Sequence, residues 1–118
     1  MDESIQREYM DGKPAVITLA DLVFENEIRL DAGNCPIRMF WVEAPHTDDS
    51  SLIEVPDEHL LFLGDATCGT FPDQRKSPEL CDKLRLAIQS SSADTCLEGH
   101  WTPLSKAETV NDLLADCQ

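Results

Sequence analysis

Residues 51–65 read SLIEVPDEHLLFLGD, and their pattern of apolar and turn residues predicts part of a β-sheet. Residues 51–55 are a strand candidate. Residues 60–63 are apolar at every position, which is typical of a strand buried on both sides of a sheet. Between them, Pro56-Asp57-Glu58 has the residue types of a turn. The stretch therefore predicts a β-hairpin whose second strand needs cover on both faces.

Further strands are predicted on the N-terminal side of this hairpin. Residues 15–19 follow Pro14 and are short, β-branched and apolar, and residues 27–30 alternate charged with apolar side chains. Residues 37–42 carry bulky side chains on both alternating faces. The first half of the chain is therefore expected to be rich in β-structure.

The hydrophobic period changes from two to about 3.6 after residue 70. Ser77-Pro78-Glu79 supplies an N-cap, a first-turn proline and an acid at the positive end of the helix dipole, which predicts a helix over residues 77–89. A short strand is predicted over residues 94–98, and Ser105-Lys106-Ala107-Glu108 has the spacing of a capping box that starts a last helix. This order predicts an α/β (α+β) fold, a mainly antiparallel sheet with two C-terminal helices on one face.

The predicted layers do not balance. Strands that are apolar on both faces need cover on both faces, whereas two amphipathic helices provide only one layer. The second layer must come from another copy of the chain, from another polypeptide or from a portion of a larger domain.

Length and charge limit the possible functions. The 118 residues have room for one domain, predicted over residues 14–118 and preceded by a flexible acidic arm over residues 1–13. The 23 acidic residues against nine basic ones leave a formal net charge of -14, with no basic cluster larger than Arg75-Lys76. Nucleic acids and anionic membranes are therefore excluded as expected partners.

The cysteines and the apolar runs bear on the compartment. The five cysteines form an odd set without a CxxC pair, which fits reduced thiols better than a disulfide framework. The apolar runs are too short for a transmembrane helix, and the acidic N-terminus does not resemble a signal peptide. We therefore expect a cytoplasmic protein.

Three polar residues stand at the ends of predicted strands. His46 ends one strand, Asp65 follows the strand over residues 60–63, and His100 follows the strand over residues 94–98. Imidazole and carboxylate form a mixed nitrogen and oxygen set that suits zinc, manganese or iron. The third histidine, His59, lies in an acidic turn and is expected to be a solvated side chain without a function.

Two segments resemble the later half of the metallo-β-lactamase superfamily. In residues 44–66, a His-Thr element precedes a strand, a turn and an apolar strand that ends in Gly-Asp, and Gly99-His100-Trp101-Thr102-Pro103 is similar to the family's final Gly-His element. Order, spacing and local structure agree over residues 14–116. The resemblance implies half of an αββα sandwich.

The resemblance also implies roles for the three strand-end residues. His46 and His100 match metal-ligand positions, and Asp65 matches the carboxylate that bridges two metals. In the family, a divalent metal, expected here as zinc, iron or manganese, polarises the substrate and turns bound water into hydroxide. Cys68 lies three residues beyond Asp65 and either approaches this site or is a semi-buried thiol.

The family's main signature, His-x-His-x-Asp-His, does not occur in this sequence. Three ligand groups shared between two metal positions leave neither with a full set. We therefore expect the C-terminal part of a metal-dependent hydrolase that is inactive alone, and weak or substoichiometric zinc binding.

Two kinds of partner follow from the incomplete fold. One is a complementary N-terminal half, and the other is a second copy in a homodimer that buries Phe40, Val42 and Phe62. The alternative to the hydrolase hypothesis is a non-catalytic module that keeps the half-fold and self-associates or binds a partner.

Overall fold

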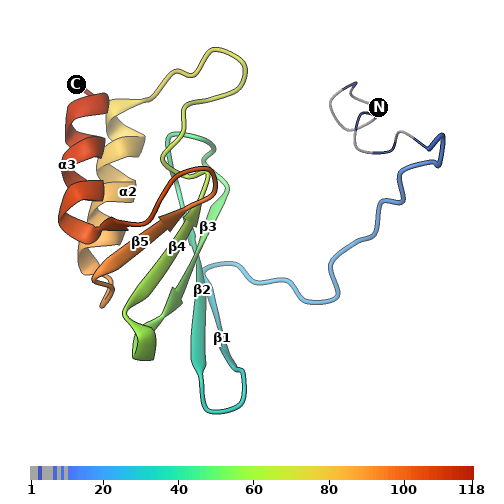
Figure 1. Cartoon of the computed structure of the whole chain (residues 1–118), viewed down its shortest axis with the longest axis horizontal. Helices are drawn as coiled ribbons and strands as arrows, with labels where there is room; N and C mark the ends of the chain where they lie inside the picture. The colour runs from blue at the N-terminus through green and yellow to red at the C-terminus, as the bar shows by residue number, and fades with distance from the viewer. Residues whose placement is uncertain (1–2, 4–6, 8, 10) are drawn as a thin grey trace.

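Six strands form a single sheet in the computed structural model, which describes residues 3, 7, 9 and 11–118 of the chain (Figure 1). The strands follow one another across the sheet in chain order. They are β1 (Glu27–Asp31), β2 (Pro36–Val42), β3 (Ser50–Val55), β4 (Leu60–Gly64), β5 (Thr95–Glu98) and β6 (Leu104–Ser105). Only β4 and β5 run parallel, since helix α2 (Pro78–Ser90) connects them, and all other neighbours are antiparallel.

The predicted hairpin is confirmed. β3 and β4 pair with Glu54 opposite Leu61, and the turn between them is a 3-10 helix, η1 (Pro56–Glu58). His59 closes this turn with a φ of 54°, in the left-handed region that a non-glycine residue rarely adopts. The hairpin therefore forms as its turn residues indicate.

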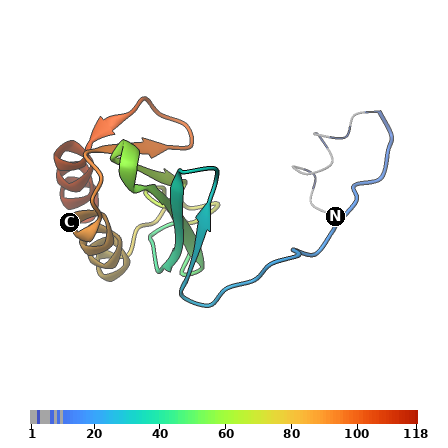
Figure 2. The same ribbon diagram turned by 90° about the horizontal axis from the view of Figure 1, so that it is seen from below.

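Both helices begin where their capping residues predict. The Ser77 side chain accepts a hydrogen bond from the Leu80 backbone N–H at the start of α2. The start of α3 (Lys106–Asp116) has a complete capping box between Ser105 and Glu108. The two helices lie side by side on one face of the sheet (Figures 1 and 2).

The hydrophobic core lies between this helix layer and the sheet. Leu52, Leu61 and Leu63 point from the strands toward Leu84 and Ile88 of α2, and all five are almost fully buried. The core therefore has two layers, as the sequence predicts, and it uses one face of the sheet only.

The opposite face of the sheet is apolar and has no helix over it in the described part of the chain (Figure 2). Cross-strand pairing places one row of side chains side by side on this face: Ile28, Met39, Ile53, Phe62 and Leu97. A second row lies two residues along the strands: Leu30, Ile37, Val55 and Leu60. We call these nine residues the open face. The predicted need for a second layer is thus visible in the structure.

The sequence assigned two residues to the wrong face. Phe40 and Val42, expected in a dimer interface, point toward the helices and are only 7% exposed, whereas Phe62 lies on the open face and is 41% exposed. Bulky side chains on both alternating faces of β2, and apolar residues at every position of β4, leave the face of each one undetermined, because alternation is the signal that separates the faces.

The strand predicted over residues 15–19 does not form. These residues are extended without strand pairing and lead away from the sheet, and Val16, Ile17 and Leu19 are at least 80% exposed. A strand needs a neighbouring strand to accept its hydrogen bonds, so β-branched composition alone does not create one. Residues 1–2, 4–6, 8 and 10 of the predicted arm lie outside the described residues.

The expectation that the cysteines are reduced is wrong for one pair. Cys81 in the first turn of α2 and Cys117 after α3 form a disulfide with a Cα–Cα distance of 6.2 Å, while Cys35, Cys68 and Cys96 are free. The pairing joins residues 36 positions apart, and it depends on the start of α2 lying beside the end of α3 (Figure 1). Within the described residues, no helix is long and apolar enough to span a membrane.

Candidate functional site

The parallel pairing of β4 and β5 brings Asp65 and His100 together. Each residue lies just beyond the carboxyl end of its strand, and parallel neighbours end at the same edge of a sheet. The His100 Nε2 atom is 3.1 Å from the Asp65 Oδ1 atom. The Gly99 N–H donates to the Gly64 carbonyl at 2.8 Å and fixes the two strand ends against each other. Two of the three predicted ligand residues are therefore neighbours.

Gly99 leaves room for this approach. A Cβ atom added at residue 99 would lie 2.5 Å from Asp65 Oδ1, well inside van der Waals contact. Any other side chain at this position would displace the carboxylate from His100. The glycine of the Gly-His element thus has a steric role in the site.

His46 takes a different position, in the loop after β2. Its Nδ1 atom lies 2.9 Å from the carbonyl oxygen of Gly69. A carbonyl only accepts hydrogen bonds, so Nδ1 carries a proton, and in the neutral ring the lone pair lies on Nε2. Metal-bound histidines commonly have this arrangement, in which a backbone carbonyl orients the ring through the second nitrogen.

The three predicted ligands do not form one group. Among the described residues there is no cluster of three or more histidine, cysteine or acidic side chains that could hold a metal ion. The side chains of Asp65 and His100 are 41% and 65% exposed, so the pair opens toward solvent. The donor types fit a divalent metal, but their number fits only part of a coordination sphere.

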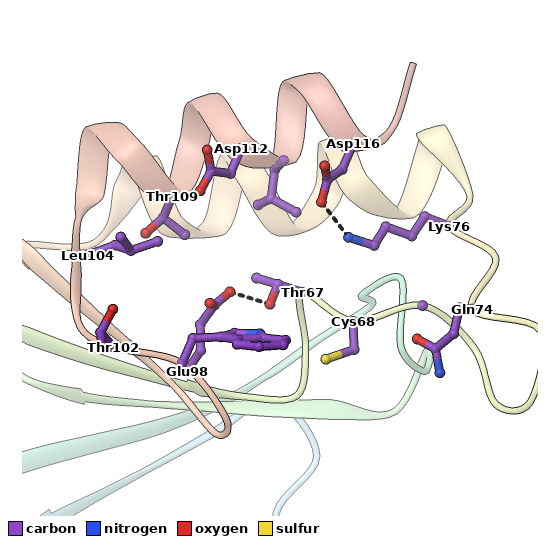
Figure 3. A pocket seen from close by; sticks show the side chains of 13 residues that line it. Thr67, Cys68, Gln74, Lys76, Glu98, Thr102, Leu104, Thr109, Asp112 and Asp116 are labelled. Carbon is purple, nitrogen blue, oxygen red and sulfur yellow. Dashed lines mark hydrogen bonds and ion pairs between the residues drawn. The ribbon is translucent and has the colours of Figure 1, made fainter.

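A cavity of about 430 Å³ lies between α3 and the loops that carry Asp65 and His100 (Figure 3). Thr67 and Cys68 line it just after Asp65, and Glu98 lines it just before Gly99 and His100. Glu98 accepts a hydrogen bond from the Thr67 hydroxyl. On the α3 side, Lys76 and Asp116 form an ion pair at 2.8 Å. The cavity therefore lies next to the ends of β4 and β5, where the candidate site is.

The surroundings of Cys68 in this cavity favour the protonated thiol. Burial raises the pKa of the Cys68 thiol, and the negative charges of Asp65 and Glu98 raise it further, against a smaller opposite effect of Lys76. A raised pKa keeps the sulfur protonated, whereas a nucleophile or a metal ligand acts as the thiolate. This environment favours the semi-buried thiol over an active residue.

Sequence reasoning missed the role of Glu98 in this region. Its neighbours Cys96 and Leu97 mark it only as the end of a short strand. The available signal is its position directly before Gly99-His100 and directly after Leu97. Because successive strand residues point to opposite faces and Leu97 lies on the open face, the Glu98 carboxylate lies on the helix side of the sheet. The hydrogen bond to Thr67 then connects the end of β5 to the loop after β4.

Known structures share this fold, although no protein-family model and no curated protein matches the chain. A metallo-β-lactamase family protein from Thermus thermophilus is 18% identical with a TM-score of 0.62, and the match covers 96% of this chain and 44% of that one. An archaeal metallo-β-lactamase superfamily protein from Sulfolobus tokodaii is 14% identical with a TM-score of 0.61, covering 96% and 47%. A metallo-β-lactamase from Pontibacter korlensis is 16% identical with a TM-score of 0.58, covering 94% and 52%.

The chain thus spans about half the length of the solved structures it matches. At these identities the similarity establishes the fold, which corresponds to about half of the fold of these structures. The open face is the side of this half-domain on which the described residues place no second layer.

Proposed function

We propose that this chain supplies one half of the active site of a metal-dependent hydrolase and is inactive by itself. The observation that carries the proposal is the Asp65–His100 pair, held at 3.1 Å where two parallel strands end, with a glycine at residue 99 that leaves room for the carboxylate. The half-domain fold shared with metallo-β-lactamase structures supports the same conclusion.

The resemblance and the geometry together support the following residue roles. His46 and His100 would each offer an imidazole nitrogen, and Asp65 would offer the carboxylate between two metal positions. A bound divalent ion such as zinc, iron or manganese would polarise the substrate and lower the pKa of water. The Gly69 carbonyl holds the proton on Nδ1 of His46, which leaves Nε2 as the donor atom.

A complementary half-domain would complete the site. This chain contains no His-x-His-x-Asp-His motif, so that motif would have to come from the segment that packs on the open face. The chain's length, about half that of the structures it matches, fits this division of the ligands.

Zinc titration of the isolated chain by calorimetry tests the ligand assignment. We expect weak, substoichiometric binding that falls at least about tenfold in His100→Ala, since one of few ligands is lost. His59→Ala is the matched control. The His59 Nδ1 atom also lies near an aspartate, 3.8 Å from Asp94 Oδ2, but His59 is at the other end of β4 from the site. Zinc binding that His100→Ala leaves unchanged would contradict the assignment.

Reconstitution tests the activity. A half-domain that carries His-x-His-x-Asp-His, added to this chain, should restore metal-dependent hydrolysis, and Asp65→Ala should abolish it. No hydrolysis with any such partner would leave the second candidate function, a non-catalytic module that self-associates or binds a partner. The apolar character of the open face is the observation that favours this second candidate.

A further inference from the structure

The open face contains no ionisable side chain, although the chain carries a net charge of -14. Its nine residues are aliphatic, methionine or phenylalanine, and two of them, Leu30 and Phe62, are each 41% exposed. A contiguous apolar surface on a highly charged protein marks an interaction site. Because no charge lies on this face, covering it desolvates no ionised group.

A second apolar surface lies just before β1. Residues 15–24 read AVITLADLVF and contain one charged residue, Asp21. The exposed fractions of Ile17, Leu19 and Val23 are 86%, 89% and 86%. We call residues 15–24 the apolar segment. It extends away from the body of the protein on the side opposite the helices, the side toward which the open face points (Figure 2).

From these two surfaces we infer that a second copy of this chain covers the open face. The two sheets stack through their open faces, and each apolar segment lies along the other copy. The direction of the apolar segment is consistent with this arrangement, because the segment leads away from the sheet on the side opposite the helices (Figure 2). Reciprocal exchange of a segment is a common route to a symmetric dimer.

The estimated areas of the open face and the apolar segment indicate that a stable dimer needs both surfaces. Five strands about 4.8 Å apart and about 17 Å long present a face of roughly 400 Å². Stable interfaces bury about 600–1,000 Å² on each partner, so sheet stacking alone falls short. An extended segment of ten residues, about 33 Å long and about 10 Å wide, adds roughly 300 Å². The open face and the apolar segment together reach the size of a specific interface.

The same face would receive a complementary half-domain in the proposed hydrolase. Self-association and completion of the metal site therefore compete, and the homodimer is the state of the chain without that partner. The two proposals fail separately, because the mass of the isolated chain is independent of zinc binding and of hydrolysis.

Sedimentation equilibrium of the full chain at micromolar concentration tests the inference. We expect the mass of two chains, and we expect dimerisation to strengthen between about 50 and about 500 mM salt, because added salt screens the repulsion between two acidic copies. A monomeric mass with cooperative unfolding would overturn the inference, as would dissociation by salt.

Two substitutions locate the interface. Phe62→Asp on the open face should raise the dimer dissociation constant about 100-fold, because the change acts twice at a twofold interface and each 1.4 kcal/mol is a factor of about ten. Leu86→Asp on α2 is the control, since Leu86 is 57% exposed on the helix layer, and it should leave the constant unchanged. Circular dichroism of Phe62→Asp checks that the monomer keeps its secondary structure.

Leu19→Asp probes the apolar segment, which takes no part in the sheet, so this variant keeps the fold. We expect at least an about tenfold weaker dimer for it. Amide hydrogen exchange over residues 15–24 should be slow in the dimer and fast in Phe62→Asp, because the segment is protected only by the partner. A dimer that survives either Phe62→Asp or Leu19→Asp at full strength refutes the arrangement.

Discussion

Replacing Glu54 by glutamine is predicted to destabilise the protein by about 2 kcal/mol. Glu54 lies on β3 with 4% of its surface exposed, and its carboxylate accepts hydrogen bonds from the Ser92 backbone N–H at 2.7 Å, the Ser92 hydroxyl at 2.8 Å and Arg38 Nη1 at 2.9 Å. These bonds connect β2 and β3 to the segment that leads into β5, and β5 positions His100. The amide of the introduced glutamine keeps the shape of the side chain but loses the charge that Arg38 and Ser92 bind.

The magnitude follows from the charge-assisted bonds. A hydrogen bond to a charged group contributes about 1.5–3 kcal/mol to stability. Removing one partner of a buried ion pair costs about 3–5 kcal/mol. Glutamine still accepts one bond from Ser92, and Arg38 keeps its 2.6 Å bond to Glu27, so about 2 kcal/mol is expected. For a chain of this length, that corresponds to a melting temperature lower by about 8 °C.

Acid should reduce the difference in stability between the wild type and Glu54→Gln. Burial raises the pKa of Glu54, but the hydrogen bonds from Ser92 and the ion pair with Arg38 outweigh burial, and the pKa lies below its ordinary value of 4.5. A lowered pKa gives stability that is present above about pH 4.5 and is lost as the pH falls through the folded-state pKa. The wild type should therefore exceed Glu54→Gln in stability at pH 7 and approach it at pH 3.

Urea unfolding followed by circular dichroism at both pH values measures the effect. Glu58→Gln is the matched control, because Glu58 is exposed in η1, and it should change the free energy of unfolding by less than about 0.5 kcal/mol. A loss below about 1 kcal/mol for Glu54→Gln at pH 7, or an undiminished loss at pH 3, would refute the reasoning.

Three further perturbations have defined outcomes. Gly99→Ala should push the Asp65 carboxylate off its site and weaken zinc binding at least about tenfold in calorimetry, with less than about 1 kcal/mol change in stability; unchanged affinity would show that residue 99 tolerates a side chain. Cys81→Ser should lower the free energy of unfolding in urea by about 3–4 kcal/mol, since the bond to Cys117 closes a 36-residue separation, and a reductant should have no further effect on the variant. Leu61→Ala, at a fully buried position between sheet and helices, should cost about 3 kcal/mol in the same assay, and a loss under about 1 kcal/mol would mean that the core collapses around it.

The elements themselves were predictable from the sequence because their signals are local. Capping by Ser77 and Ser105 fixed the starts of both helices, and the turn at Pro56-Asp57-Glu58 fixed the hairpin. The strand prediction for residues 15–19 is wrong because strand formation depends on a partner strand, which β-branched composition does not provide. The two-residue strand β6 carries no periodic signal and was not expected.

The candidate site was predictable in part. His100 and Asp65 were recognisable as strand-end residues, and their contact at 3.1 Å agrees with that expectation. His46 does not join them in a group of three possible ligands, and its Nδ1 contacts the Gly69 carbonyl instead. The hydrogen bond between Glu98 and Thr67 joins residues 31 positions apart, and no pattern in the sequence marks it.

Local patterns in the sequence predict the strands from residue 27 to residue 64, both C-terminal helices, the imbalance of the layers and the residue types at the strand ends, because hydrophobic period, turn chemistry and capping act over a few neighbouring residues. Three features depend on how the chain packs in space: which face of the sheet is open, the bond between Cys81 and Cys117, and the contact between Asp65 and His100. Each of these depends on the parallel crossover from β4 through α2 to β5, together with the return of α3 along α2. Contacts between residues so far apart in the chain are set by packing, which local patterns do not encode.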